Sequence, residues 1–537
     1  MENVVGEIKQ FFRGEILTDF AHISGYSSDL SPLYVLPKIV VIPLDSSDLA
    51  SLIRWLSLYN KRYPELSLSV RGSNASSIGS SLTPGIMVDL RRLSEVYSID
   101  NNKIMFGAGA KASSVHNLNR VSKYLPDVEP NDTNSSIGGL IATNARASYN
   151  LHGTIGDSIK ALKVILADGR EYTFCKINKR ELIAKIKQKD FEGHIYREIY
   201  KLITNNSNLL ENIYSGSMGY IISNIFNRET KSIDLSKLFL ASEGTLGIIT
   251  KALIEAKPLE RYRILTNIYL KNLDHLQKVI DVLNELPVDS VRSFSRGIYS
   301  KTLDYIHRAD LNEDREEWIY EHDNIFKGVS KNARIPELTL EVVFSGNEPS
   351  EVVYKIKQLE AGLDDLPVSY EIVKYKEDRK RFERMEDFKP ITKFFGLETK
   401  SLGGLDDLYI PVSKIEKFIK KAKRYFNSNH IKFEMSGSLV NGHIQLYPYW
   451  KQNEVLTKTM IHNLLLDLYT LVKEYGGHIS FSQGDGLIKA PFIPMFKTKE
   501  QIDFEINLKL IFDPDNIFSR NKKYDASWSK TAKYLKK

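Results

Sequence analysis

Residues 67–79 read Ser-Leu-Ser-Val-Arg-Gly-Ser-Asn-Ala-Ser-Ser-Ile-Gly, a short alternation of polar and apolar side chains followed by small residues. The alternation over residues 67–70 has the period of two that is typical of a strand. The small residues lie between Gly72 and Gly79, and such a run lets backbone N–H groups approach an anion closely. Further donors come from Arg71, Ser73, Ser76 and Ser77. An ordinary Gly/Ser turn is the alternative, and the flanking sequence has to decide.

The flanking segments alternate between strand and helix patterns. Residues 38–43 (Lys-Ile-Val-Val-Ile-Pro) are rich in β-branched side chains and end at proline, which predicts a strand. A helix is predicted at residues 49–61, with an N-cap among residues 46–48. Further strands are predicted at 86–90 and 103–109, and a further helix at 112–124. This order is an α/β layout.

Three later segments carry glycine where an element begins or ends. Residues 137–144 read Ile-Gly-Gly-Leu-Ile-Ala-Thr-Asn. The glycine pair either allows close approach to a flat or charged group or forms a turn ahead of a helix. Residues 160–174 predict a hairpin around an Asp-Gly turn. Residues 239–249 read Phe-Leu-Ala-Ser-Glu-Gly-Thr-Leu-Gly-Ile-Ile, which predicts a strand, a tight turn and a second strand.

Composition narrows the class of protein. A chain of 537 residues is too long to fold around a single hydrophobic core, so two or three domains are expected. The net charge of +7 is slight for this length. Nucleic-acid binding is therefore not expected, and the charge favours anionic substrates or an anionic membrane surface. Cys175 is the single cysteine, which excludes an intrachain disulfide and a metal or iron–sulfur site built from cysteines.

The sequence shows no targeting pattern. No apolar run reaches the length of about 18 residues that a membrane-spanning helix needs. The first 13 residues mix acidic and basic side chains, unlike a signal peptide. We therefore expect a cytoplasmic protein, with peripheral contact at the inner face of the membrane left open.

Taken in order, four segments resemble the FAD-binding domain of the vanillyl-alcohol oxidase/D-lactate dehydrogenase superfamily, also called PCMH-type flavoproteins. They are residues 70–79, 137–144, 164–169 and 242–249. The most specific is Ser-Glu-Gly-Thr-Leu-Gly-Ile-Ile-Thr, which begins at Ser242. The resemblance continues towards the C-terminus. The sequence Asp-Asp-Leu-Tyr-Ile-Pro-Val from Asp406 resembles a cap-domain strand of the D-lactate dehydrogenase/glycolate oxidase branch, and residues 511–518 resemble its closing motif.

The resemblance covers most of residues 36–525 and implies a fold. We expect an α+β protein with a two-subdomain FAD-binding PCMH-type domain and a cap domain of antiparallel sheet and helices. The predicted divisions are a helical segment at 1–35, the FAD-binding domain at 36–258 with a helical insertion at about 176–235, the substrate or cap domain at 259–505, and a segment at 506–537 that returns to the FAD-binding domain.

The resemblance also implies non-covalent FAD. The first Gly-rich loop would wrap the pyrophosphate, and the backbone around residues 137–139 and at Ile248 would line the isoalloxazine and adenosine. The implied cofactor-binding residues are Arg71, Gly72, Ser73, Asn74, Ala75, Ser76, Gly79, Ile137, Gly138, Gly139, Asn144, Glu243, Gly244, Gly247 and Ile248. Ala75 stands where the family has threonine, which removes one neutral hydrogen bond of about 1 kcal/mol.

The family pattern changes just after Asn144. The usual Gly-Gly pair is Arg146-Ala147 here, and the usual tyrosine before Gly153 is His152. A covalent flavin–histidine bond and an exposed loop histidine are the two interpretations of His152. The second agrees with the expected non-covalent FAD.

The catalytic motifs of the family are replaced. In the hydroxyacid branch, the resemblance implies hydride transfer from a 2-hydroxy acid to flavin N5. A histidine acts as base there, and a metal held by two histidines and a glutamate orients the substrate. The two metal-binding histidines correspond to Ser438 and Gln445, and the Glu-His pair of the second motif to Ser482 and Gln483. Serine and glutamine are poor bases and poor ligands for divalent metals, so no metal is expected.

Three residues are candidates for the missing catalytic roles. His443 and His478 lie in the same segments as the replaced motifs. They form either a rearranged acid–base pair or structural strand residues. Lys400 shortly precedes the Asp406-Asp407 pair and is either an anion clamp or a solvated surface lysine.

The leading hypothesis is an FAD-dependent oxidoreductase of the D-lactate dehydrogenase-like group. Its small-molecule substrate would be an alcohol or resemble a 2-hydroxy acid, and its electron acceptor would be a quinone, an electron-carrier protein or oxygen. The alternative is a catalytically degenerate relative that acts as a structural or binding subunit, with or without FAD. The retained Gly-rich loops favour flavin binding, and the replaced residues favour the alternative.

Overall fold

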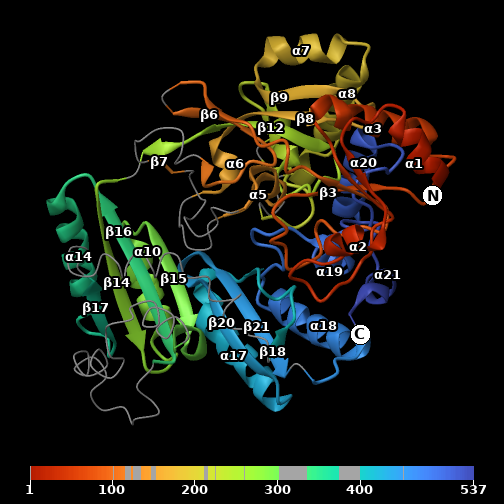
Figure 1. Cartoon of the computed structure of the whole chain (residues 1–537). Coiled ribbons are helices and arrows are strands. Elements are labelled where there is room, and N and C mark those ends of the chain that lie inside the picture. Colours follow the sequence, from red (N-terminus) through yellow and green to blue (C-terminus); the bar gives the residue numbers. More distant parts are fainter. Residues whose placement is uncertain are drawn as a thin grey trace, which may run out of the picture.

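In a computed structural model, the chain forms two lobes, which occupy the upper and lower parts of Figure 1. The upper lobe holds the strands up to residue 258, and the lower lobe is built on the strands that follow. The residues that the structure describes are 2–100, 102–114, 123–124, 135–146, 153–210, 216–223, 225–258, 260–300, 336–373, 399–451 and 453–536.

The first sheet of the upper lobe contains the strand that leads into the Gly- and Ser-rich loop. Its order is β1-β2-β4-β3, in which β4 pairs in parallel with β2 and β3, and β1 pairs antiparallel with β2. The strands are β1 (Glu15–Leu17), β2 (Ile39–Ile42), β3 (Leu68–Arg71) and β4 (Ile86–Asp89).

Helix α3 (Ser46–Tyr59) connects β2 to β3 and begins earlier than the sequence pattern predicts. Its N-cap is Asp45, whose side chain accepts a hydrogen bond from the backbone N–H of Asp48 at 2.9 Å. The predicted start at residue 49 was wrong because an aspartate ahead of the serines satisfies the first free N–H groups of the helix.

A segment from far along the chain completes the outer edge of β3. The N–H of Leu68 donates to the carbonyl of Ile517 at 2.8 Å, and the N–H of Ser519 donates to the carbonyl of Leu68 at 2.8 Å. This segment follows helix α20 (Lys499–Phe512), so the predicted division after residue 505 falls inside a helix.

The second sheet of the upper lobe is antiparallel, in the order β10-β11-β9-β8-β12-β6-β5. The structure contains the predicted hairpin, since β8 and β9 pair around the Asp-Gly turn. The strand predicted ahead of the turn at 242–247 was wrong, because residues 235–239 form a 3₁₀ helix. The strands are β5 (Val96–Ser98), β6 (Lys103–Gly107), β8 (Ile159–Ile165), β9 (Glu171–Ile177), β10 (Phe226–Asn227), β11 (Ser232–Asp234) and β12 (Ile248–Glu255).

The stretch predicted as a helical insertion contains both helices and strands. Its helices are α7 (Lys179–Lys187), α8 (Phe191–Asn205) and α9 (Ser207–Leu210). Strands β10 and β11 lie in the same stretch and extend the second sheet beyond β9. The helix predicted at 112–124 lies largely outside the described residues, and its last two residues form β7 (Lys123–Tyr124), which pairs with β13 (Lys257–Pro258).

The lower lobe is a second antiparallel sheet covered by a layer of helices (Figure 1). The strand order is β17-β14-β16-β15-β20-β21-β18, and β19 also pairs with β21. The strands are β14 (Tyr262–Leu270), β15 (Ser290–Ser295), β16 (Leu338–Gly346), β17 (Ser369–Val373), β18 (Thr399–Ser401), β19 (Leu408–Tyr409), β20 (Lys432–Ser438) and β21 (His443–Lys451). The helices are α10 (Leu276–Glu285), α14 (Pro349–Leu363), α17 (Ile415–Ser428) and α18 (Lys458–Glu474).

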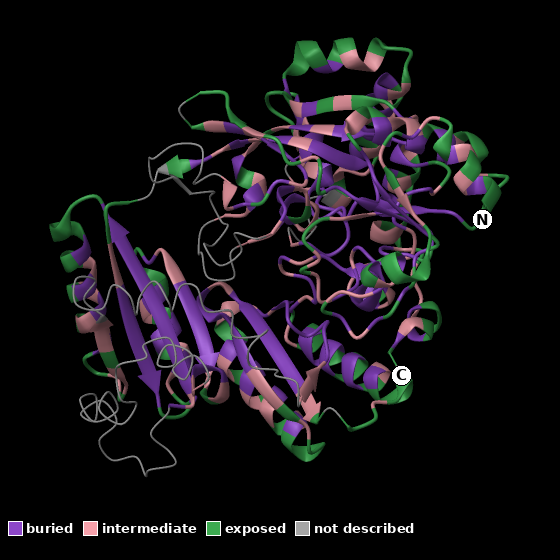
Figure 2. Cartoon of the chain, viewed as in Figure 1, coloured by how far each residue is buried: buried purple, intermediate pink, exposed green. Residues whose placement is uncertain are grey.

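Buried apolar side chains form one large cluster in each lobe, and the long strands of the lower sheet are mostly buried (Figure 2). Helix α20 adds Phe504, Leu508 and Phe512 to the cluster of the upper lobe. The predicted α+β fold, with a two-part upper domain and a cap of antiparallel sheet and helices, is confirmed. No helix among the described residues is both long and apolar enough to cross a membrane.

Candidate functional site

A cavity of about 440 Å³ is lined by residues of both lobes. The upper lobe contributes the loop after β3, helix α5 (Ile137–Thr143) and the turn before β12. The predicted cofactor-binding residues that line it are Arg71, Gly72, Ser73, Asn74, Ala75, Ser76, Gly138, Gly139, Glu243, Gly244, Gly247 and Ile248. Gly79, Ile137 and Asn144 are buried and do not line the cavity.

The loop after β3 has the close backbone packing that a bound pyrophosphate requires. A Cβ atom on Gly72 would lie 1.9 Å from Oγ of Ser136, so only glycine fits there. Asn74 adopts a positive φ of 64°, and its side-chain Oδ1 is buried without a hydrogen-bond partner. The guanidinium of Arg71 lies 4.8 Å from the centre of the Tyr26 ring. A loop of small residues beside a fixed cation fits an elongated anionic group such as the pyrophosphate of FAD.

Helix α5 sets the position of the residues that follow it. Its N-cap Ser136 accepts a hydrogen bond from the N–H of Gly139 at 3.3 Å, and the helix ends at Asn144, where φ is 50°. This left-handed residue turns the chain so that Ala145 and Arg146 both line the cavity.

Glu243 lies at the cavity wall, but its carboxylate is engaged by protein donors from other segments. It accepts hydrogen bonds from Ser80 Oγ at 2.8 Å and from the N–H groups of Asp485 and Gly486 at 3.0 and 2.9 Å. The ammonium of Lys523 lies 2.9 Å from Glu243 and 2.7 Å from the Asp485 carboxylate. Burial lowers the pKa of Lys523, but the two carboxylates raise it above its ordinary value. Glu243 therefore joins the upper lobe to the cap.

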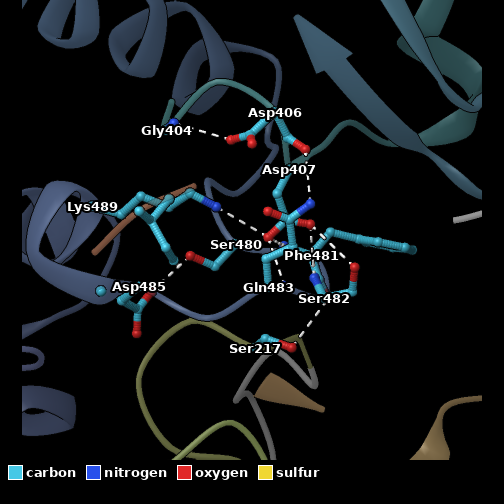
Figure 3. Close-up of polar contacts among 12 residues, drawn as sticks. Ser217, Gly404, Asp406, Asp407, Ser480, Phe481, Ser482, Gln483, Asp485 and Lys489 are labelled. Atoms are coloured by element: carbon cyan, nitrogen blue, oxygen red, sulfur yellow. Dashed lines mark hydrogen bonds and ion pairs between the residues drawn. The ribbon is translucent and has the colours of Figure 1, made fainter. Parts of the chain in front are cut away.

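The cap side of the site is organised by the buried carboxylate of Asp407 (Figure 3). This carboxylate accepts hydrogen bonds from the N–H groups of Phe481, Ser482 and Gln483 at 2.9 to 3.1 Å. The Lys489 ammonium lies 3.0 Å away. Burial raises the pKa of Asp407, but the charge of Lys489 and the contact with His443 bring it below its ordinary value. Asp407 is thus ionised, and its carboxylate holds the loop at 481–483 through these hydrogen bonds.

Two of the residues that replace the family's metal and base motifs, Gln445 and Gln483, are bound by protein groups. Oε1 of Gln445 accepts from Ser436 Oγ at 2.8 Å, and its Nε2 donates to the carbonyl of Asp406 at 3.1 Å. Gln483 likewise accepts from Ser77 Oγ and donates to the carbonyl of Asp406, each at 3.3 Å. Within the described part of the chain, no three His, Cys, Asp or Glu side chains gather as a metal site would require. The absence of a metal stays a prediction.

The two candidate histidines lie behind the cavity wall. His443 is fully buried, with Nε2 3.4 Å from Oδ1 of Asp407 and its ring stacked on Phe481 at 4.8 Å. His478 stacks on Tyr409, and these two residues exchange backbone hydrogen bonds of 2.8 and 2.9 Å. Burial and the nearby Lys497 lower the pKa of His478 to about 4. Neither histidine lines the cavity.

Lys400, the third candidate, does not line the cavity either. It lies in β18, and its ammonium donates to the backbone carbonyl of Glu454. The following residue, Ser401, lines the cavity, whereas Lys400 does not. The structure therefore gives Lys400 a contact within the cap.

Several cavity residues were not singled out as site residues by the sequence. Asp406 and Tyr447 line the cap wall together with Gln445, Ser482 and Gln483. Gln445 and Tyr447 are two residues apart in β21, so they share one face of the sheet. The strand pattern places the two residues on one face, but only the folded structure shows that this face meets the cavity.

Two family models match the chain in the same order as the two lobes. Residues 37–174 match the FAD binding domain, and residues 319–522 match the C-terminal domain of FAD linked oxidases. The chain belongs to the PCMH-type family of FAD flavoproteins. FAD is accordingly the cofactor of this flavoprotein.

Curated relatives of this flavoprotein are distant in sequence. D-2-hydroxyglutarate dehydrogenase of Escherichia coli (strain K12) is 23% identical over 542 residues, which cover 95% of this chain and 50% of that protein. D-lactate dehydrogenase of Archaeoglobus fulgidus is 22% identical over 525 residues, covering 95% of this chain and 97% of the relative. The chain thus spans about half the length of the first of these relatives.

Solved structures share the fold of this flavoprotein over nearly its whole length. The 4-ethylphenol oxidase of Gulosibacter chungangensis superposes with a TM-score of 0.69 at 14% identity, covering 97% of this chain and 96% of the other. p-Cresol methylhydroxylase gives a TM-score of 0.69 at 11% identity, with 98% of each chain covered. At these identities the likeness shows the fold alone.

Proposed function

We propose that this flavoprotein is an FAD-dependent oxidoreductase of the D-lactate dehydrogenase-like group. Its substrate is an alcohol or resembles a 2-hydroxy acid, and hydride passes from the substrate carbon to flavin N5. The proposal rests on the cavity, which has a Gly-rich wall from the upper lobe and a polar wall from the cap. Relatives named as D-2-hydroxyglutarate dehydrogenase, D-lactate dehydrogenase and glycolate oxidase subunit GlcD support the same chemistry.

In this proposal the upper lobe holds the cofactor non-covalently. FAD, when bound, supplies a two-electron acceptor at its N5 atom. Backbone N–H groups between Gly72 and Ser77 bind the pyrophosphate, and Arg71 adds positive charge beside it. Gly138, Gly139 and Gly247 line the cavity, and a Cβ atom on any of them would collide with neighbouring protein atoms, so bare backbone faces the flat ring system here.

The cap orients the substrate and accepts its proton without a metal. Glu243 and Asp406 are the carboxylates among the described residues that line the cavity. Glu243 is engaged by Lys523 and Ser80, which leaves Asp406 to accept the hydroxyl proton. Asp406 is held by the N–H of Gly404 at 3.0 Å. The hydroxyl of Tyr447, 3.2 Å from Ser436 Oγ, provides a hydrogen bond to the substrate oxygen.

The visible spectrum of the purified protein tests this proposal. We expect flavin absorbance, either as isolated or after addition of FAD, and release of free FAD on denaturation. Under anaerobic conditions D-lactate, glycolate or D-2-hydroxyglutarate should bleach the flavin. The D406N variant should retain FAD but lose most of the bleaching rate. A protein that takes up no FAD, or whose flavin no hydroxy acid or alcohol reduces, would contradict the proposal.

The electron acceptor, the membrane contact and the cytoplasmic location remain part of the proposal. Comparing reoxidation of the reduced flavin by oxygen, a soluble quinone and an artificial electron-carrier dye identifies the class of acceptor. Sedimentation with anionic lipid vesicles tests peripheral membrane contact.

The second candidate function is a structural or binding subunit. This alternative is favoured because the side chains of Gln445, Gln483 and Asp407 bind other groups of the protein, as polar side chains in a packed core do. FAD that binds stoichiometrically but is never reduced by a substrate would support this alternative.

A further inference from the structure

Part of the cavity wall comes from a segment that precedes the matched FAD binding domain. Leu30 lines the cavity, although the family model begins only at residue 37. This leucine is 57% exposed. We refer to residues 28–31 as the strap. The strap therefore presents an apolar side chain to a group bound in the cavity.

The strap is joined to the loop after β3 by hydrogen bonds from three of its four residues. The bonds run from the N–H of Leu30 to the carbonyl of Ser76 at 3.0 Å, from Nδ2 of Asn74 to the carbonyl of Ser28 at 3.1 Å, and from the N–H of Gly79 to Oδ2 of Asp29 at 3.0 Å. They are spread along the loop that would hold the pyrophosphate. The strap therefore helps to fix the backbone of that loop.

Residues 534–536 hold the strap from its other side. They run antiparallel to residues 32–34, and the bridge between the two segments joins Leu33 to Leu535. Their hydrogen bonds run from the N–H of Tyr34 to the carbonyl of Tyr534 at 2.7 Å, from the N–H of Lys536 to the carbonyl of Pro32 at 2.9 Å, and from the ammonium of Lys536 to the carbonyl of Ser31 at 3.0 Å.

The paired leucines anchor this arrangement in the cap. Leu33 and Leu535 are both buried in the apolar cluster of the lower lobe. Leu33 also packs closely on the loop after β3, since a Cβ atom on Gly79 would lie 2.8 Å from its Cδ1. The strap thus bonds to a loop of the upper lobe while the residues beside it are anchored in the lower lobe. Displacing the strap requires breaking contacts with one lobe or the other.

We propose that the strap and residues 534–536 form a clasp that covers bound FAD with Leu30 and slows its release. Contact between Leu30 and the cofactor removes apolar surface from water, which favours the bound state. The hydrogen bonds of the strap hold the loop in one conformation, which lowers the entropy lost on binding. Both segments lie outside the ranges that the two family models match, so the clasp is an addition to the matched domains. It concerns retention of the cofactor and goes beyond the proposed reaction.

The rate of FAD release tests the role of Leu30. FAD-loaded full-length protein is diluted into buffer, and the rise of flavin fluorescence is followed. We expect L30A to release FAD about 5- to 30-fold faster, the range for losing a partly buried leucine contact. L30M keeps the apolar volume and should release FAD nearly as slowly as the wild type. The matched control is L58A on α3, because Leu58 is also exposed but does not line the cavity.

Hydrogen–deuterium exchange tests the second arm of the clasp. In the wild type, FAD should slow amide exchange across residues 28–36 as well as in the loop after β3. L535A removes a buried side chain behind the strap, so exchange at residues 28–36 and release of FAD should both become about tenfold faster. L510A, at an exposed position on α20, should change neither.

Three results would overturn the inference. They are an L30A variant that releases FAD at the wild-type rate, FAD binding that leaves exchange at residues 28–36 unchanged, and an L535A variant that releases FAD faster without faster exchange in that segment. None of these measurements needs substrate turnover. A clasp that behaves as expected around a flavin that no substrate reduces would refute the proposed reaction and leave this inference standing.

Discussion

The ammonium of Lys489 lies 3.0 Å from Oδ2 of Asp407, and both side chains are completely buried in the cap. The pair lies behind the loop at 481–483, whose three N–H groups bind the same carboxylate. Two residues of that loop, Ser482 and Gln483, line the cavity. The pair therefore fixes the shape of the substrate side of the site, although neither of its side chains lines the cavity.

Removing one partner of this pair should destabilise the protein strongly. D407N leaves a buried ammonium without a counter-charge, and such losses cost about 3–5 kcal/mol. Thermal unfolding followed by circular dichroism should show a large decrease in Tm. The control is E198Q, which breaks an exposed ion pair with Lys201 on α8 and should change Tm little. A D407N protein as stable as E198Q would contradict this interpretation.

Removing both partners should cost less than the sum of the single changes. The double variant D407N/K489M leaves no unpaired buried charge, although the three loop N–H groups lose a charged acceptor. A double-mutant cycle on Tm or on the denaturant midpoint measures the coupling. Strict additivity would show that the two groups do not act together.

The half-buried histidine His478 should make stability depend on pH. Its folded-state pKa is lowered from 6.5 to about 4, so the unfolded state binds more protons between these values. Its contribution is complete above pH 6.5 and is lost as the pH falls towards 4. We expect H478Q to flatten the decrease in Tm over this window, whereas H194Q, at an exposed position on α8, should not. Parallel pH profiles for wild type and H478Q would refute the assignment.

Gly72 should be irreplaceable for FAD binding. G72A places a Cβ atom 1.9 Å from Oγ of Ser136, so the loop after β3 or the start of α5 must move. We expect the purified G72A protein to contain much less FAD, with Tm lowered as well. The matched control is G6A in α1 (Glu2–Lys9), where nothing lies within 4 Å and alanine favours the helix by about 0.5–1 kcal/mol. Equal FAD content in the two variants would contradict the prediction.

The link between the lobes should depend on Lys523. K523M leaves the carboxylates of Glu243 and Asp485 buried side by side without their shared cation. We expect faster proteolysis between the lobes and weaker retention of FAD, since Glu243 and Asp485 hold the two walls of the cavity together. K530M, which removes an exposed contact with Asn521, is the control. Unchanged proteolysis and FAD retention in K523M would argue against this link.

Local sequence patterns predicted many elements of the upper lobe because these elements are short and end at clear turn or breaker residues. The strands at 39–42 and 86–89 and the hairpin of β8 and β9 follow from β-branched runs and an Asp-Gly turn. The strand expected ahead of Ser242 failed because residues 235–239 pack as a 3₁₀ helix against the core. In that segment, packing against the core outweighed the local preference for a strand.

The site was only partly predictable, since side-chain roles depend on distant partners. Glu243 belongs to the most specific motif, yet Lys523, which lies 280 positions later, determines what its carboxylate does. His443 is two residues from Gln445 on the same strand, but its ring stacks on Phe481 and does not line the cavity. No periodicity in β21 reveals that difference. It depends on the conformation of the loop at 481–483.

Strand β3, which leads into the FAD loop, gains its outer neighbour from residues close to the end of the sequence. Lys522 donates to Ser69 Oγ at 2.8 Å across 453 positions of sequence, next to the backbone pairing of Leu68 with residues 517–519. A ribosome must therefore translate the whole cap before β3 gains its second neighbour. Until then the emerging upper lobe exposes a bare strand edge, which is prone to wrong pairing. We therefore expect FAD loading to follow translation of residue 522, and chaperones that shield strand edges to raise the yield of loaded protein in cells.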